Sequence, residues 1–386
     1  MIYAIPLIKN AFYNERDTRH GLAQFIQTDS YLSMGEQCQK FEETFARKQG
    51  RKYAVLVNSG GSANLALLQA LVNLRRIRAG DRCGFSALTW STNVMPIIQM
   101  GLEPVPVDVQ SNTLNTTRAM ITQQAQPIRV MFITNALGFC GDLDSISRWC
   151  NENNAILLED NCESLGTTTQ YGKTGNFGLA STFSFYVAHH ISTIEGGMIC
   201  TDDYELYNML KIVRSNGWDR NLSEKEQLKV RAGIPEFQAK YTFYNLAYNF
   251  KPTEITGWLG NNQMQYYDDI MDAREKNYRA VASAIKSNND ILPLADASYQ
   301  KLPAFAIPVI CDSPESRTKY LERFGKAGIE TRPVIAGDIT QQPFWKRKYP
   351  SRRMIGVRYV HDCGFYYGNC PDYTTEEIET IAGCLE

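Results

Sequence analysis

The sequence lacks both an excess of charge and a long apolar run. Its 386 residues carry 40 lysines and arginines against 41 aspartates and glutamates, for a formal net charge of −1. Such a balance creates no field that would attract nucleic acid or a membrane surface, so we expect a small polar ligand. No apolar run approaches the ~20 residues that span a bilayer, and the first residues do not resemble a signal peptide. These absences favour a cytoplasmic protein.

Closely spaced cysteines are also missing. The ten cysteines are scattered along the chain, and no two of them show the two-residue gap of a zinc or redox motif. Buried free thiols in a reducing compartment explain this pattern best. We therefore expect neither a metal site nor a disulfide framework.

Length and patterning indicate an α/β protein with two domains. A single core stops growing at roughly 250 to 300 residues, which is less than the length of this chain. Short β-like runs alternate with helical segments between residues 50 and 200, which predicts a mostly parallel sheet covered on both faces. A long helix is expected from about Thr256. We place a large domain with an N-terminal arm at residues 1–255 and a small domain at residues 256–386.

The sequence contains few histidines, and two of them are adjacent. Of four histidines, His189 and His190 are adjacent, between a β-like run and the glycine pair at residues 196–197. A histidine in such a place is more often a bystander than a catalyst. Upstream, however, the apolar run at residues 156–158 leads into the acidic pair that ends at Asp160, and ligands of open parallel sheets bind at the ends of strands. These two segments together predict a binding site.

The segment from Glu159 to Gly197 resembles the cofactor region of the vitamin B6-dependent nucleotide-sugar aminotransferases of fold type I. In that family a Ser-Phe-x-x-x-Lys stretch precedes Glu-Gly-Gly, and its lysine holds the cofactor as a Schiff base. Counting five residues from Ser184 leads to His189 in this sequence. A histidine there, and the double histidine itself, resemble a branch of 3-dehydratases that act on nucleotide-linked 4-keto-6-deoxy sugars.

This resemblance implies a fold, a cofactor and a reaction. The expected fold is a large domain with a mostly parallel sheet and a smaller C-terminal α+β domain, assembled as a homodimer. The expected cofactor is pyridoxal or pyridoxamine 5'-phosphate, with L-glutamate as the amino donor and a setting in surface polysaccharide assembly. An imidazole cannot form the stable Schiff base, but its pKa of ~6.5 suits proton transfer. His189 is therefore expected to act as the base in the loss of the C3 hydroxyl.

The resemblance also assigns contacts to the cofactor ring. Asp160 would keep the pyridine nitrogen protonated, although a strand-end aspartate can also cap a helix. Trp90 would stack on the ring, although a tryptophan is more often core. Glu163 is expected near the ring, and Ser184 is expected to contact the cofactor as well.

The phosphate is expected at a turn between a β-like run and a helix from Asn64. Such a turn can offer free backbone amides, although glycine and serine turns are also ordinary connectors. The resemblance assigns the phosphate contact to Gly61 and Ser62, and Gly61 would act only through its amide. Asn249 resembles an asparagine that reaches the cofactor phosphate of the partner subunit, which implies a shared active site.

Arg332 lies in a segment similar to the Glu-Thr-Arg-Pro signature of the sugar 3-dehydratases. A guanidinium has the geometry to hold carboxylate or phosphate groups, so we expect Arg332 to contact glutamate or the nucleotide sugar, although it could be a surface charge. Two departures from the family pattern are Ile194, where glycine is usual, and Asp338, where asparagine is usual.

Two alternatives to the dehydratase stay open. An aminotransferase would need another lysine, such as Lys173 or Lys251, in place of the missing one. A non-catalytic homologue could instead sense a form of vitamin B6 or a sugar nucleotide, and Ile194 keeps this alternative open.

Overall fold

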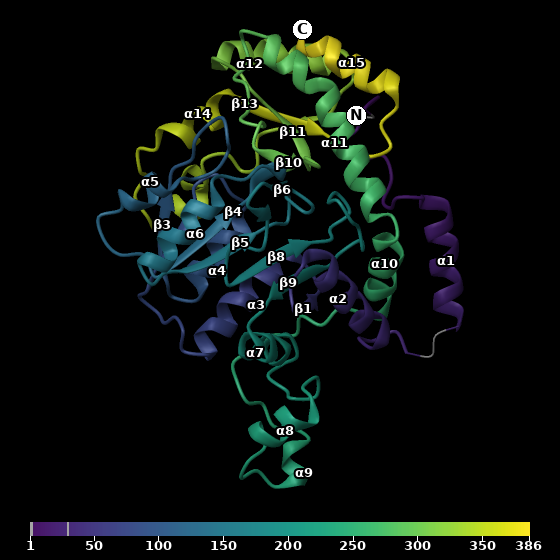
Figure 1. Ribbon diagram of the computed structural model, residues 1–386, viewed down its shortest axis with the longest axis vertical. Helices are drawn as coiled ribbons and strands as arrows, with labels where there is room; N and C mark the ends of the chain where they lie inside the picture. The colour runs from purple at the N-terminus through teal and green to yellow at the C-terminus, as the bar shows by residue number, and fades with distance from the viewer. Residues whose placement is uncertain (1–2, 29–30) are drawn as a thin grey trace.

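A seven-stranded sheet forms the centre of the large domain (Figure 1). The structure is a computed structural model that describes residues 3–28 and 31–386. The strand order in this sheet is β1-β9-β8-β5-β4-β2-β3. The strands are β1 (Tyr53–Val57), β2 (Arg82–Ser86), β3 (Glu103–Val107), β4 (Val130–Thr134), β5 (Ile156–Asp160), β8 (Ala180–Ser184) and β9 (Gly197–Thr201). Only the two pairings made by β9 are antiparallel, so the prediction of a mostly parallel sheet is confirmed.

Helices cover both faces of this sheet because its strands are apolar on both sides. Along β1, Val55 and Val57 belong to one hydrophobic cluster and Ala54 and Leu56 to another, as expected for side chains that alternate between two faces. The first cluster includes side chains of α3, α4 and α7, and the second includes side chains of α2 and α11. The helices of the large domain are α1 (Glu15–Thr28), α2 (Glu36–Gln49), α3 (Gly60–Asn73), α4 (Ser91–Gln99), α5 (Arg118–Thr122), α6 (Leu143–Glu152) and α7 (Tyr204–Arg214), with the 3-10 turn η1 (Ala136–Gly138).

Helix α3 begins earlier than the sequence indicated. We expected a turn at residues 58–63 and a helix from Asn64, but the helix begins at Gly60. The side chain of Ser59 accepts a hydrogen bond from the amide of Ser62 at 3.1 Å, which is the geometry of a helix N-cap. The glycine pair therefore lies in the first helical turn.

The small domain contains a three-stranded antiparallel sheet in the order β11-β13-β12. Its strands are β11 (Ala306–Ile310), β12 (Thr331–Arg332) and β13 (Gly364–Gly368). Helices α11 (Tyr267–Ser287), α12 (Pro314–Lys326), α14 (Ile355–Cys363) and α15 (Thr375–Leu385) surround it (Figure 1). Shorter elements of the same part of the chain are β10 (Tyr299–Lys301), η2 (Ile339–Gln341) and α13 (Pro343–Lys346). The expected α+β character of this domain is confirmed.

The connection between the two domains differs from the single helix expected from Thr256. Two helices occupy this stretch, α10 (Glu254–Met264) and α11, separated at Gln265 and Tyr266. The ring of Tyr13 in the N-terminal arm packs on Tyr266 at 5.4 Å, and Gln263 bonds both backbone groups of Tyr13. The domain boundary at residue 255 stays a prediction.

The N-terminal arm extends across the small domain. Ile5 forms a bridge with Ile329, and its amide donates to the carbonyl of Gly328 at 3.1 Å. The amide of Leu7 donates to the carboxylate of Glu330 at 2.9 Å. The arm thereby runs from the small domain back to α1.

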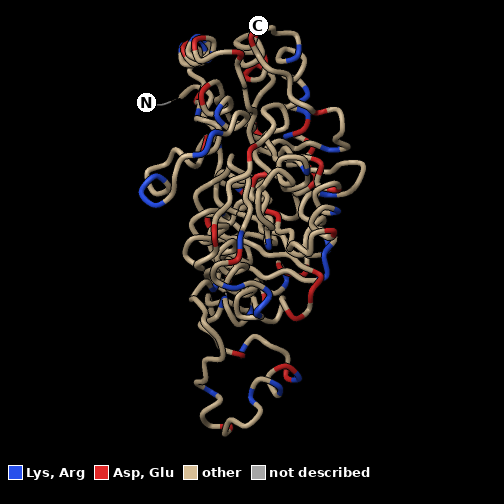
Figure 2. The backbone as a smooth tube through the Cα atoms, turned by 90° about the vertical axis from the view of Figure 1, so that its left-hand side faces the viewer, with Lys and Arg blue, Asp and Glu red and all other residues tan. Residues whose placement is uncertain are grey.

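A separate segment projects from the lower end of the molecule in Figure 1 and contains α8 (Glu224–Val230) and α9 (Glu236–Ala239). Two short strands, β6 (Thr168–Thr169) and β7 (Gly172–Lys173), form a third sheet with β10, in which β6 lies in the middle. Basic and acidic residues are interspersed along the chain, without separation of the two signs (Figure 2).

Within residues 3–28 and 31–386, no helix has the length and apolar character needed to cross a membrane.

Candidate active site

Three strands of the large sheet end at the wall of one cavity. Ser59 follows β1, Asp160 ends β5 and Ser184 ends β8, and all three line a cavity of about 460 Å³. The carboxyl ends of parallel strands meet at one edge of a sheet, which explains how distant segments converge. The predicted residues on this wall are Gly61, Trp90, Asp160, Glu163, Ser184 and His189.

The carboxylate of Asp160 is buried and held in place. One oxygen accepts from the side-chain amide of Asn64 at 2.9 Å, and the other accepts from the backbone amide of Cys162 at 2.8 Å. The orientation of Asn64 is fixed by a bond of 2.6 Å from the hydroxyl of Thr182. In the described chain the next helix begins only at Tyr204, so Asp160 is not a helix cap. Its geometry suits a protonated pyridine nitrogen.

The first turn of α3 leaves a space beside Ser184 that any residue larger than glycine at position 60 would fill. A Cβ atom on Gly60 would lie only 2.6 Å from the Cβ atom of Ser184. Gly61 lines the cavity, and the first amides of a 14-residue helix suit a phosphate group. Ser62 does not line the cavity, and its amide and hydroxyl both form hydrogen bonds with the side chain of Ser59.

The two adjacent histidines have different surroundings. The imidazole of His189 lies on the cavity wall and packs on the ring of Phe305 at 5.0 Å. The Nε2 atom of His190 lies 2.7 Å from the carbonyl of Pro303, which fixes this second ring in the protein interior. Burial and, as the second cause, the positive charge of Arg274 together lower the pKa of His189 to about 3. The ring of His189 is therefore neutral and able to accept a proton.

Glu163 is the second group on the wall with a shifted pKa. The pKa of its carboxyl is raised to about 8, chiefly by burial and also by the nearby Asp160, against the opposing effect of a 2.8 Å hydrogen bond from the amide of Leu137. Glu163 is therefore protonated at neutral pH. The cavity thus brings a neutral imidazole and a neutral carboxyl together.

Besides Ser62, the predicted residues Arg332 and Asn249 lie outside the cavity. Arg332 lines an adjoining cavity of about 540 Å³, which shares Trp90 and Tyr366 with the first, and its guanidinium pairs with Glu330. Asn249 is exposed and forms a bridge with Ser215, away from the cavity of its own chain.

The lysines proposed as replacements are also outside the cavity. The amine of Lys173 donates to the carbonyl of Lys48 at 2.7 Å, and the amine of Lys251 lies 5.7 Å from the ring centre of Trp218. No lysine stands among the described residues that line the cavity. The chain therefore offers no visible substitute for the missing Schiff-base lysine.

The departures from the family pattern have local structural effects. Ile194 has a φ of +71°, a conformation that is strained for a β-branched residue and free of strain for glycine. Asp338 is buried and accepts hydrogen bonds from the amide and hydroxyl of Thr340, so it shapes a turn and does not line the cavity.

Sequence reasoning missed the small-domain side of the cavity. Phe305, Ile335 and Tyr366 complete its wall, together with Tyr186 and Glu195 from the large domain. No motif marks Phe305 or Tyr366, because their place depends on how the small domain packs on the large one.

Fold and site together define a class, the vitamin B6-dependent enzymes of fold type I, and the described cavity wall contains His189 and no lysine. The sequence profile of the DegT/DnrJ/EryC1/StrS aminotransferase family matches residues 14–386. The chain belongs to this family.

Similar proteins within the family are sugar 3-dehydratases. GDP-4-keto-6-deoxy-D-mannose 3-dehydratase of Escherichia coli O55:H7 is 30% identical over 376 residues, which cover 96% of this chain and 97% of that protein. The solved E. coli enzyme with bound hydrated pyridoxal phosphate (PLP) matches with a TM-score of 0.92 and 29% identity, over 100% of both chains. Another structure, of GDP-4-keto-6-deoxymannose-3-dehydratase with a trapped PLP-glutamate geminal diamine, has a TM-score of 0.91 and 30% identity, over 99% of this chain and 100% of that one. The resemblance noted in the sequence is confirmed.

The raised pKa of Glu163 predicts a pH-dependent stability. Between pH 4.5 and about pH 8 the folded chain keeps a proton that the unfolded chain has released, so stability falls as the pH rises through this window. A Glu163→Gln variant cannot titrate and lacks this loss. We expect its melting temperature, relative to the unmodified protein, to increase steadily from pH 5 to pH 8. Thermal unfolding followed by circular dichroism measures the difference.

The exposed Glu379→Gln serves as the control, and its difference from the unmodified protein is expected to be constant. A Glu163→Gln difference that is equally constant across the range contradicts the raised pKa.

Proposed function

We propose that this protein is a dehydratase that removes the C3 hydroxyl of a nucleotide-linked 4-keto-6-deoxyhexose, with pyridoxal or pyridoxamine phosphate as cofactor and L-glutamate as amino donor. The product is a 4-keto-3,6-dideoxy sugar. The observation that carries the proposal is the neutral imidazole of His189 on a cavity wall that contains no lysine among the described residues. The high similarity to sugar 3-dehydratases over nearly the whole chain supports the same reaction.

The strand ends and α3 would hold the cofactor. The carboxylate of Asp160 would pair with the pyridine nitrogen, and the amides of Gly60 and Gly61 would bind the phosphate. Trp90 would cover one side of the ring, and Ser184 would contribute a hydroxyl near the phosphate. When bound, the cofactor supplies an electron sink for chemistry at the substrate carbons.

His189 would then move protons between the reacting atoms. A neutral imidazole accepts a proton from carbon, and the imidazolium formed in a buried site is a strong acid. It therefore returns the proton readily to the departing hydroxyl oxygen. Glu163, which holds its proton at neutral pH, would present a hydrogen-bond donor on the same wall.

The adjoining cavity would receive the polar part of the substrate. Arg332 and Arg317 both line it, and Trp90 stands between it and the cofactor cavity. The Nε atom of Arg317 is buried without a hydrogen-bond partner in the described chain. Two guanidinium groups provide the donors that a carboxylate or phosphate requires.

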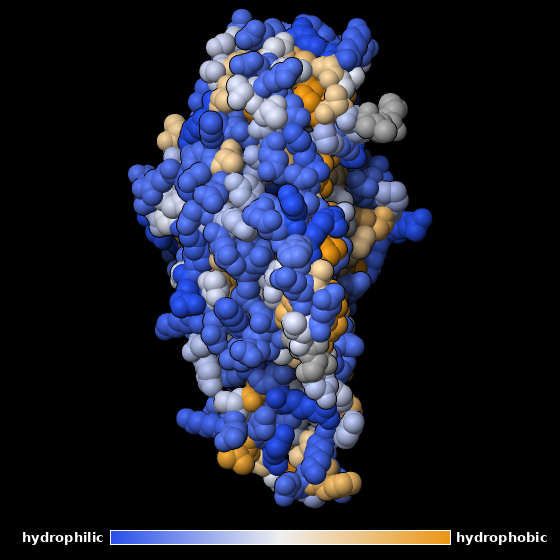
Figure 3. Space-filling view, turned by 90° about the vertical axis from the view of Figure 1, so that its right-hand side faces the viewer, coloured by the Kyte–Doolittle hydropathy of each residue, from blue (hydrophilic) through white to orange (hydrophobic). Residues whose placement is uncertain are grey.

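We also propose a homodimer with shared active sites in the cytoplasm. The projecting segment exposes large apolar side chains that a monomer would leave in water (Figure 3), namely Leu228, Phe237, Tyr241, Phe243 and Leu246. The exposed Asn249 lies at the base of this segment, from which it could reach the cofactor phosphate of a second subunit. Ten free cysteines, nine of them buried, suit a reducing compartment.

An assay of the products tests the proposed reaction. Incubated with pyridoxal phosphate, L-glutamate and GDP-4-keto-6-deoxymannose, the protein is expected to give a 3-deoxy sugar and free ammonia. A His189→Asn variant is expected to lose about 10²- to 10⁴-fold in rate, the usual contribution of a general base. Lys173→Met is the matched control and is expected to retain full activity. A 4-amino sugar would instead support an aminotransferase, and no conversion would support a sensor.

Mixing two inactive variants tests the shared site. If Asn249 acts in the partner's site, a mixed dimer of His189→Asn and Asn249→Ala subunits has one site with both defects and one intact site. An equal mixture after subunit exchange is then expected to recover about a quarter of the unmodified activity, since half of the dimers are mixed. Recovery confined to the sum of the two separate variants would contradict sharing.

A further inference from the structure

A buried guanidinium lies directly behind the segment that carries His189. Arg274 on α11 is only 5% exposed. Its hydrogen bonds within the described chain go to three backbone carbonyls, those of Asn369 at 2.7 Å, Phe305 at 2.9 Å and His189 at 3.5 Å. Its Nε atom has no partner there. A buried charge held by carbonyl dipoles alone is costly, which calls for an explanation.

The three carbonyls belong to three segments that are far apart in sequence. His189 follows β8, Phe305 precedes β11, and Asn369 follows β13. The side-chain amide of Asn369 bonds the carbonyl of Arg274 at 3.0 Å and that of Ala304 at 2.7 Å. Arg274 and Asn369 thus hold the segment that carries Phe305 in place by hydrogen bonds to its backbone carbonyls. The ring of Phe305 packs on the imidazole of His189.

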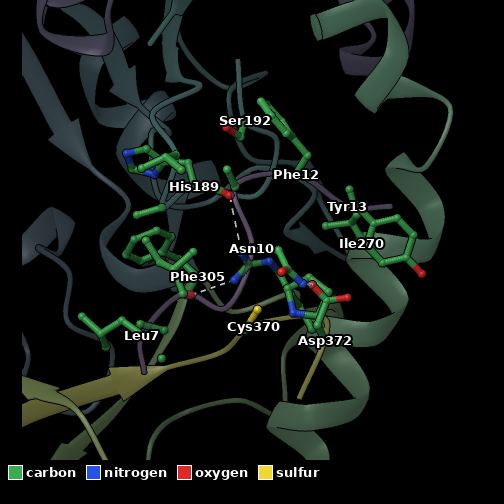
Figure 4. A pocket seen from close by; sticks show the side chains of 18 of the residues that line it. Leu7, Asn10, Phe12, Tyr13, His189, Ser192, Ile270, Phe305, Cys370 and Asp372 are labelled. Atoms are coloured by element: carbon green, nitrogen blue, oxygen red, sulfur yellow. Dashed lines mark hydrogen bonds between the residues drawn. The ribbon is translucent and has the colours of Figure 1, made fainter. Parts of the chain in front are cut away.

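A small pocket of about 80 Å³ lies beside these hydrogen bonds (Figure 4). Its lining includes His189, Arg274 and Phe305, and Asn10 of the N-terminal arm lies opposite. In Figure 4 the imidazole of His189 points away from the centre of the pocket. A dashed line marks the hydrogen bond from the guanidinium of Arg274 to the backbone carbonyl of His189. The volume suits two or three water molecules at ~30 Å³ each and is too small for a sugar.

Both acidic and basic groups surround His189. The other titratable groups that line the two cavities at this ring are Tyr13, Asp160, Cys162, Glu163, Tyr186, Glu195, Arg274, Tyr366, Cys370 and Asp372, and His190 is the neighbour in sequence. Among these described residues Arg274 alone carries a permanent positive charge. The carboxylate of Asp372 accepts from the side chain of Asn10 at 2.9 Å and forms no ion pair with Arg274 within the described chain.

We propose that Arg274 is a positioning residue for the catalytic base: it holds the imidazole of His189 against Phe305 and keeps that imidazole uncharged between turnovers. The catalytic meaning of this inference rests on the proposed dehydratase function. A positive charge behind the ring disfavours the imidazolium, so the ring is unprotonated at rest and, once protonated, is a strong acid that does not retain the proton it receives.

Titration of the histidines by NMR tests the inference without any turnover. The chain contains only four histidines, and the signal of His189 is the one missing from a His189→Asn variant. In the unmodified protein we expect the His189 signal to show no titration near its ordinary pKa of ~6.5. In Arg274→Met its midpoint is expected to move up toward that value, whereas Arg274→Lys is expected to leave it low.

Two further variants complete the experiment. Arg274→Gln can still donate to a carbonyl but has no charge, so it is expected to behave like Arg274→Met, and it replaces that variant if Arg274→Met does not fold. Arg279→Met removes a more exposed arginine from the same helix and is expected to change nothing. An unchanged His189 midpoint in a folded, neutral Arg274 variant overturns the inference.

The pH profile of activity separates this inference from the proposed function. The acid limb of kcat/KM is expected to shift to higher pH in Arg274→Gln by the same interval as the NMR midpoint, with Arg274→Lys restoring the original limb. If the midpoint moves but even the unmodified protein forms no 3-deoxy sugar, the proposed function fails while the effect of Arg274 on His189 stands. Loss of rate at every pH without a shifted limb or midpoint would reduce Arg274 to a purely structural role.

Discussion

The convergence of strand ends at one edge of the sheet is the constraint on which the site depends. Ser59, Asp160 and Ser184 are far apart in sequence, yet each stands where a parallel strand stops. The strands are held in register by pairings such as Asp160 with Thr182, so the side chains at their ends cannot shift independently. A carboxylate, a helix N-terminus and an imidazole therefore face one cavity with little freedom.

Burial shifts the pKa values of two groups on the wall, Glu163 and His189, in opposite directions. It raises the pKa of Glu163 and lowers that of His189, because in each case it disfavours the charged form. Both groups are consequently neutral at physiological pH, one with a proton to donate and the other able to accept one. This complementary pair is what an elimination requires, and a surface site could not maintain it.

The sequence predicted the large-domain side of the site and much less of the small-domain side. Asp160 and His189 are recognisable because each follows an apolar strand and matches a short motif. Phe305 and Arg274 carry no such signal, since their positions depend on packing between segments roughly 85 to 115 residues from His189 in the chain.

The starts and ends of helices show the same limit of prediction from sequence. The sequence predicts a turn at the glycine pair of residues 60–61, although the cap formed by Ser59 places both glycines in the first turn of α3. The stretch from Thr256 looked like one helix, although the N-terminal arm meets it at Tyr266, where α10 and α11 separate. In both cases a contact decided the outcome, and composition alone could not show it.

The central claim is that an imidazole occupies the position where related enzymes anchor their cofactor. The most direct measurement is the mass of a His189→Lys variant after incubation with pyridoxal phosphate and reduction with borohydride. We predict the mass of one reduced cofactor per chain, attached to residue 189, and no such addition in the unmodified protein. Attachment at Lys173 or Lys251 in the variant, or no attachment at all, would contradict this account of the site.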